Sequence, residues 1–122
     1  MMDQTYIPDR SHLIWLDFEP TKGREIGKYR PALVLSSKSY NQETRLLICC
    51  PVSTGVRGHL TEVPVPNLDK PSVIVSNLLQ TLSWKERKAK HITTVENEVF
   101  DAVIVRILPL IGADRAIQNH MH

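Results

Sequence analysis

The sequence predicts a β-rich α+β fold: a small antiparallel barrel or rolled sheet with one amphipathic helix at its C-terminal end. Several short apolar runs are separated by glycine and proline, which is typical of strands joined by turns. Only the segment before residue 112 repeats apolar side chains at helical spacing. With 122 residues, of which 42% are hydrophobic, the chain has enough apolar material for one core but not for two.

The expected strands follow the apolar runs in chain order. They cover residues 12–18, 32–35, 46–50, 61–65, 73–75 with an extension toward 82, and 88–93. Pro51 closes the third run, and Pro64 places the fourth at the edge of the sheet, because proline lacks the N–H that an inner strand needs. The polar residues 36–44 predict a turn of helix, and the loops 20–29 and 53–59 contain glycine breakers.

The helix signal lies at the end of the domain. Thr93 and Glu96 match a capping box, which predicts that the helix begins there. Pro109 removes one backbone donor and predicts a kink or an end, and Gly112 is a plausible stop. We therefore expect a single domain over residues 1–112 and a polar, flexible tail over 113–122.

Charge and cysteine content indicate a cytoplasmic protein without a cofactor or metal. The net charge of +2 is small, but basic residues gather in 22–30 and again in 85–90, either as solvated loops or as a nucleic-acid contact. Cys49 and Cys50 are adjacent and would point to opposite faces of a strand, so no disulfide framework or zinc spacing is present. No apolar run is long enough for a membrane span, and the N-terminus lacks an apolar signal core.

Three segments resemble one known protein family. The longest runs from Ile14 to Ser36 and includes the basic loop that ends in Lys28-Tyr29-Arg30-Pro31-Ala32. The second runs over 40–54 and continues to Glu62-Val63, and the third is Leu82-Ser83-Trp84-Lys85-Glu86-Arg87. Because order and spacing are kept over roughly residues 6–112, the chain resembles the MazF/PemK toxins of type II toxin–antitoxin systems.

The resemblance implies an SH3-like barrel with a C-terminal amphipathic helix, usually assembled as a homodimer. It implies a metal-independent, sequence-specific endoribonuclease, an mRNA interferase that cleaves single-stranded RNA to 2′,3′-cyclic phosphate and 5′-hydroxyl ends. It also implies a cognate antitoxin whose flexible acidic segment covers the RNA site, and growth inhibition when the toxin is free. Gyrase-poisoning toxins share this fold class, so the fold does not decide the target.

The catalytic residues implied by the resemblance are Arg30, Ser53 and Glu25. Arg30 matches the functional arginine of the family, and its planar guanidinium can grip two phosphate oxygens. Ser53 stands where the family usually has threonine, and it is open whether Ser53 or Thr54 faces the site or merely bonds its own turn. Glu25 matches an acidic loop position that orients Arg30, acts as a base, or is simply solvated.

The expected RNA-binding residues are Lys22, Arg24, Lys28, Thr54, Arg57, Gln80 and Trp84. The cationic ones would contact phosphates, which gives affinity and salt dependence but no sequence choice. Either tryptophan is able to stack on a base. Because Trp15 sits in an apolar strand, we expect it in the core, and we assign Trp84 to an RNA or partner surface.

The chain departs from the family pattern at four places. Ser11-His12 replaces a common Gly-Asp, and His59-Leu60-Thr61 replaces an aromatic residue and a proline. Asn77-Leu78 and Gln80 replace Asp-Gln and a lysine that border the RNA groove in the family, and Pro109 interrupts the last helix. His12 and His59 are candidate general bases, since imidazole titrates near neutrality.

These departures leave two alternative functions. One is a catalytically weakened homologue that still binds RNA or antitoxin, motivated by Asn77-Leu78 and Ser53. The other is a gyrase inhibitor of the same fold class, against which the intact Arg30-Pro31 step argues.

Overall fold

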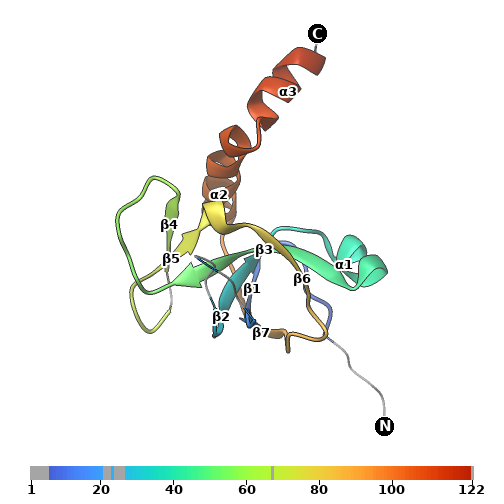
Figure 1. The fold of residues 1–122 in the computed structure, drawn as a ribbon, viewed down its shortest axis with the longest axis vertical. Helices are drawn as coiled ribbons and strands as arrows, with labels where there is room; N and C mark the ends of the chain where they lie inside the picture. The colour runs from blue at the N-terminus through green and yellow to red at the C-terminus, as the bar shows by residue number, and fades with distance from the viewer. Residues whose placement is uncertain (1–5, 21–22, 24–26, 67, 122) are drawn as a thin grey trace.

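The computed structural model describes residues 6–20, 23, 27–66 and 68–121. This part of the chain forms seven strands, one 3-10 turn and three α-helices (Figure 1). The strands are β1 (His12–Asp17), β2 (Tyr29–Val34), β3 (Leu46–Ser53), β4 (Glu62–Val65), β5 (Ser72–Val75), β6 (Gln80–Ser83) and β7 (Lys90–Thr94). The helices are α1 (Lys38–Thr44), α2 (Asn97–Leu110) and α3 (Ala113–His120), and the 3-10 turn is η1 (Ser76–Leu78).

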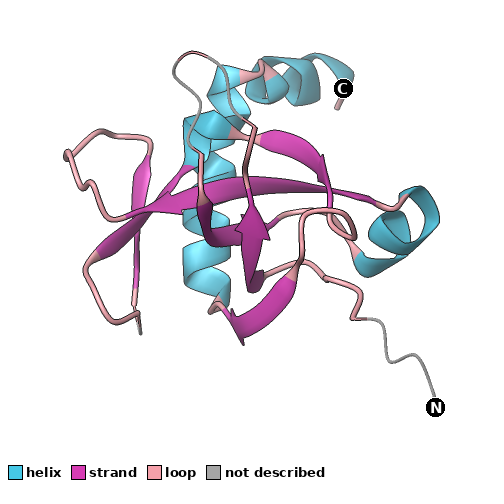
Figure 2. Cartoon of the chain, turned by 60° about the horizontal axis from the view of Figure 1, so that its bottom comes forward, coloured by secondary structure: helices cyan, strands magenta, loops and turns pink. Residues whose placement is uncertain are grey.

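The strands form one antiparallel sheet in the order β4-β5-β3-β2-β1-β7, and β6 pairs with β3 beside this path. β3 is central, because its first half pairs with β6 while Val52 and Ser53 pair with β5. Figure 2 shows the sheet curled in front of α2, with α1 beside the start of β3. The arrangement confirms the predicted β-rich α+β fold, a curled antiparallel sheet with a C-terminal helix, and β4 lies at an edge as Pro64 indicated.

Two clusters of buried side chains form the core, one on each face of the inner strands. Neighbouring residues of one strand alternate between them: Leu33 belongs to the first cluster, and Ala32 and Val34 belong to the second. α2 covers the first cluster with Val103 and Ile107. Because these strands are buried on both faces, their sequences are continuous apolar runs without alternation of polar and apolar residues.

Several strand boundaries differ from the sequence prediction; β2, for example, begins at Tyr29 rather than at Ala32. β3 does not stop at Pro51 but continues to Ser53, with Pro51 opposite Ala32 of β2. On the other edge of β3, pairing with β6 ends at Cys49 and pairing with β5 begins at Val52, so Pro51 lies between two partner strands. The run expected to extend from 73 toward 82 is likewise broken by η1 into two strands.

The start of the last helix also differs. α2 begins at Asn97, and its N-cap residue Glu96 makes no side-chain cap hydrogen bond. The capping box predicted at Thr93 is wrong, because Thr93 belongs to β7 and lies opposite Leu13 of β1. Strand pairing therefore takes precedence over the local capping pattern.

The end of the helix follows the sequence prediction more closely. α2 ends one residue after Pro109, and Gly112 takes a φ of 73°, a left-handed conformation that suits glycine. Residues 113–120, expected to be a flexible tail, instead form α3, which leads away from the strands (Figure 1). None of the helices in the described ranges is long and apolar enough to cross a membrane.

Candidate functional site

An open groove of about 710 Å³ lies where β2, the end of β3, the β3–β4 loop and η1 meet. Three residues expected at the site line it together: Arg30 from β2, Ser53 from β3 and Arg57 from the loop. His59 and Asn77 also line it. We refer to it as the Arg30 groove.

Backbone carbonyls fix the guanidinium of Arg30. Its Nε donates a hydrogen bond of 2.6 Å to the carbonyl of Gly27, and its Nη1 donates one of 3.2 Å to the carbonyl of Val52. Burial lowers the pKa of Arg30, and the charge of Glu19 opposes this shift. An arginine stays protonated in proteins, so the groove holds an oriented, half-buried cation suited to a phosphate group.

Ser53 and Thr54 face different grooves. Ser53 lines the Arg30 groove, whereas Thr54 lines a neighbouring one. The N–H of Gly55 donates to the Oγ of Ser53 at 3.0 Å, so the expected turn chemistry is present as well. A serine hydroxyl that accepts one hydrogen bond still has its own proton to donate, so Ser53 keeps a donor for a ligand in the groove.

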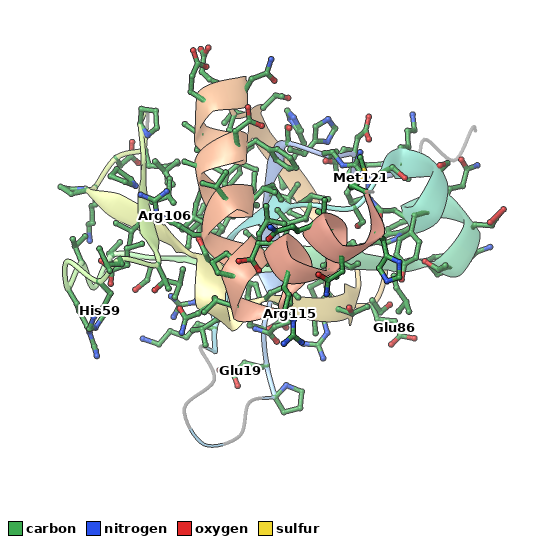
Figure 3. The ribbon with its side chains drawn as sticks, turned by 90° about the horizontal axis from the view of Figure 1, so that it is seen from above. Glu19, His59, Glu86, Arg106, Arg115 and Met121 are labelled. Atoms are coloured by element: carbon green, nitrogen blue, oxygen red, sulfur yellow. The ribbon has the colours of Figure 1, made fainter. Side chains whose placement is uncertain are left out.

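Glu62 holds the β3–β4 loop in place. Its carboxylate accepts hydrogen bonds from the N–H of Arg57 at 3.1 Å and from the N–H of Gly58 at 3.0 Å. From α2, the Nε of Arg106 donates to the carbonyl of Leu60 at 2.8 Å, and Figure 3 shows Arg106 beside the loop that carries His59. This role of Glu62 was not predictable, because a carboxylate at a strand start gives no sequence signal of the loop that it organises.

A second groove of about 530 Å³ shares Arg30 with the first. We call it the aromatic groove, because Trp15 of β1 and Tyr29 of β2 line it with stacked rings, 5.5 Å between centroids at an interplanar angle of 18°. The two side chains are 37% and 46% exposed. Lys28 and Lys70 add positive charge to the same groove, and Asp69 adds one negative charge.

The structure reverses the two tryptophan assignments. Trp84 is only 4% exposed and packs in the second core cluster, where its Nε1 donates to the carbonyl of Asn41 at 2.9 Å. The prediction that Trp84 lies on an RNA or partner surface is therefore wrong. The expectation that Trp15 is in the core is wrong too, since its side chain is 37% exposed, on the face of β1 opposite to that of the buried Ile14 and Leu16.

The remaining predicted residues divide into three groups. Lys28 lines the aromatic groove together with Thr54. Gln80 lies in β6 opposite Cys49 and is not among the described residues lining either groove, and His12 likewise lies elsewhere. Glu25, Lys22 and Arg24 fall outside the described residues.

Comparison with known proteins gives one family match. Residues 9–111 match the model of the PemK-like, MazF-like toxin of type II toxin–antitoxin systems. The endoribonuclease toxin MazF of Escherichia coli K12 is 36% identical over 111 residues, which cover 91% of this chain and the whole of that protein. The endoribonuclease PemK of E. coli is 27% identical over 100 residues, 77% of this chain and 75% of PemK.

Solved structures show the same relationship. MazF from Deinococcus radiodurans superimposes with a TM-score of 0.85 at 37% identity, covering 88% of this chain and 99% of that one. A MazE–MazF complex from the same organism matches with a TM-score of 0.77 at 33% identity, covering 88% of this chain and 98% of that one.

Proposed function

Because the chain belongs to the PemK-like, MazF-like family of type II toxins, we propose that it is the toxin of a toxin–antitoxin pair and cleaves single-stranded RNA. The Arg30 groove carries the proposal: an anchored guanidinium, a hydroxyl and a second arginine line one open groove. These are the groups that bind a phosphate and stabilise added charge on its oxygens. The names of the E. coli relatives, both endoribonucleases, support the same activity.

The proposed chemistry is an internal transesterification. The ribose 2′-oxygen loses its proton and attacks the adjacent phosphorus, so that a 2′-O–P bond forms and the P–O5′ bond breaks. The products are a 2′,3′-cyclic phosphate and a 5′-hydroxyl, whose oxygen takes up a proton. Arg30 would stabilise the charge on the phosphoryl oxygens, and Ser53 would donate its Oγ–H to one of them.

The group that removes the 2′-proton has two candidates. Glu25 remains a prediction from the family resemblance. His59 lines the groove with an imidazole, a side chain that can accept a proton, and the contacts of Glu62 and Arg106 hold its loop in place.

We propose that RNA continues from the Arg30 groove into the aromatic groove. Arg30 lines both grooves, so a strand with its scissile phosphate at Arg30 places a neighbouring base near Trp15 and Tyr29. Exposed aromatic rings stack on bases of any identity. Lys28 and Lys70 would contact flanking phosphates and make binding dependent on salt.

We also propose a cognate antitoxin and a homodimer. The MazE–MazF complexes of D. radiodurans, 32 to 34% identical in their matched chains, support an antitoxin partner. Arg30, Arg57 and Lys28 in the two grooves would suit an acidic segment of that partner. Exposed apolar side chains on α2 and α3, among them Val105, Leu110 and Ile117, support self-association. Light scattering during gel filtration should give twice the chain mass of 13.9 kDa.

The first experiment is incubation of the purified protein with a long single-stranded RNA in EDTA, followed by mapping of 5′-hydroxyl ends. We expect discrete cuts in the wild type that vanish in Arg30→Ala. Equal patterns in wild type and Arg30→Ala would refute the enzymatic assignment.

The same preparation distinguishes the alternatives. RNA binding by a folded wild type that leaves the RNA intact would indicate the weakened homologue, a possibility kept open because Asn77 and Leu78 line the Arg30 groove. Relaxed plasmid in a gyrase supercoiling reaction, without RNA products, would indicate a gyrase inhibitor.

A further inference from the structure

A cluster of one tyrosine and two histidines lies at the edge formed by β1 and β7, away from both grooves. The Tyr6 ring stacks on His12, with centroids 5.8 Å apart at 12°. His91 of β7 meets His12 edge-on, with centroids 4.8 Å apart at 79°, and also contacts the ring of Tyr6. His12 occupies one of the positions where the sequence departs from its family.

The hydrogen bonds around His12 fix its protonation state. The backbone N–H of Asp9 donates to Nδ1 of His12 at 3.2 Å, and the Tyr6 hydroxyl lies 2.6 Å from the same nitrogen. A backbone N–H is only a donor, so Nδ1 must be an unprotonated acceptor, and the tyrosine must donate to it. Burial, followed by the charge of Asp9, raises the pKa of Tyr6, so its hydroxyl keeps the proton this requires.

Charged groups around the cluster also oppose a proton on His12. Burial lowers the pKa of His12, His91 and Lys38 lower it further, and only Asp9 acts in the opposite direction. The Asp9 carboxylate is already engaged, since its Oδ1 accepts from the N–H groups of Arg10 at 2.7 Å and Lys38 at 2.9 Å.

Further contacts attach the N-terminal segment to the body of the domain. The N–H of His12 donates to the carbonyl of Asp9 at 3.1 Å, which closes a turn over residues 9–12. Tyr6 and Ile7 pack against the second core cluster, and Asn41 donates to the carbonyl of Pro8 at 2.8 Å. A proton on Nδ1 would face the Asp9 N–H and remove the acceptor that both Tyr6 and Asp9 use.

We propose that this cluster is a proton-sensitive switch, in which protonation of His12 releases residues 6–11 from the β1–β7 edge. The neutral ring favours the closed arrangement. The stability of the closed state relative to the open state is therefore greatest above the pKa of an unrestrained histidine, about 6.5. As the pH falls below that value, His12 takes up a proton in the open state before it does so in the closed state. The equilibrium constant for opening then rises by about tenfold per pH unit, until His12 is protonated in the closed state too. The inference does not depend on RNA cleavage.

Histidine-ring NMR and amide hydrogen exchange of the full chain, followed from about pH 8 to pH 5, test the proposal. We expect His12 to titrate below the pKa of an unrestrained histidine, about 6.5. We also expect the protection factors of the Ser11 and His12 amides, corrected for the intrinsic exchange rate at each pH, to fall by about tenfold or more at the acidic end. The protection factors of the β2 and β3 amides should not change.

Two variants test whether His12 itself causes the pH dependence. His12→Gln keeps an acceptor for the Asp9 N–H but does not titrate, so its N-terminal protection should become independent of pH. His120→Gln, a matched change on exposed α3, should keep the wild-type pH dependence. A wild-type His12 midpoint at or above about 6.5 would overturn the proposal even if His12→Gln failed to fold. Unchanged protection of Ser11 and His12 on acidification would overturn it as well.

Discussion

The indole nitrogen of Trp84 donates a hydrogen bond of 2.9 Å to the backbone carbonyl of Asn41, joining the segment after β6 to α1. Trp84→Phe removes this donor and some buried volume, and leaves the Asn41 carbonyl without that partner. We expect the free energy of unfolding to fall by about 1–3 kcal/mol, measured by chemical denaturation. RNA affinity per folded molecule should stay at the wild-type value; a selective loss of RNA binding in a stable protein would contradict the buried role of Trp84.

Trp15→Ala should show the opposite pattern. Its ring is 37% exposed and stacks on Tyr29, so its removal takes away an aromatic surface rather than a core side chain. We expect single-stranded RNA binding to weaken by about 1–3 kcal/mol, the usual value of one base–aromatic stack, in a fluorescence-anisotropy titration. Trp15→Phe is the matched control and should retain most of the affinity. Equal affinities for Trp15→Ala and wild type would remove the aromatic groove from the proposed RNA path.

The two tryptophans show where sequence patterns stop being informative in this chain. Trp84 is buried although the charged residues Lys85-Glu86-Arg87 follow it. Because β1 to β3 are buried on both faces, no alternation of polar and apolar residues marks the outward position of Trp15. The break of one apolar run at η1 and the helix α3 were not predicted. The approximate positions of most strands, the amphipathic helix α2 and the Gly112 stop were predictable, because they depend on local residue preferences. Sheet pairing was not, and it decides that Thr93 lies in a strand rather than at a helix cap.

The central residues of the candidate site were predictable, but the backbone groups that hold them in place were not. Arg30, Ser53 and Arg57 meet in one groove as expected. The carbonyls of Gly27 and Val52 that orient Arg30 could not be anticipated, since backbone groups carry no sequence signature. Arg87 is the converse case: it belongs to a basic cluster in the sequence, yet its Nη1 donates to backbone carbonyls near β1.

Arg30→Lys should not preserve activity. A lysine keeps the charge, but it lacks the planar group that donates to Gly27 and Val52 while facing a phosphate. We expect the cleavage rate of a fluorogenic RNA to fall by about 10²-fold or more, as for removal of one transition-state donor. Circular dichroism should show an unchanged fold, because the lost hydrogen bonds lie at the groove. Near wild-type cleavage by Arg30→Lys would mean that charge alone, rather than oriented donors, accounts for the role of Arg30.

Gly112 should control the junction between α2 and α3. Its φ is 73°, and a Cβ built there meets no atom within 4 Å, so the cost of a side chain comes from backbone strain rather than from a clash. Gly112→Ala should therefore destabilise α3 by about 1–2 kcal/mol, seen as roughly tenfold faster amide exchange over residues 113–120. Gly112→Asn is the matched control, because asparagine tolerates the left-handed region better, and it should exchange more slowly than the alanine variant. Equal exchange rates in the two variants would show that the junction is not held in the left-handed conformation in solution.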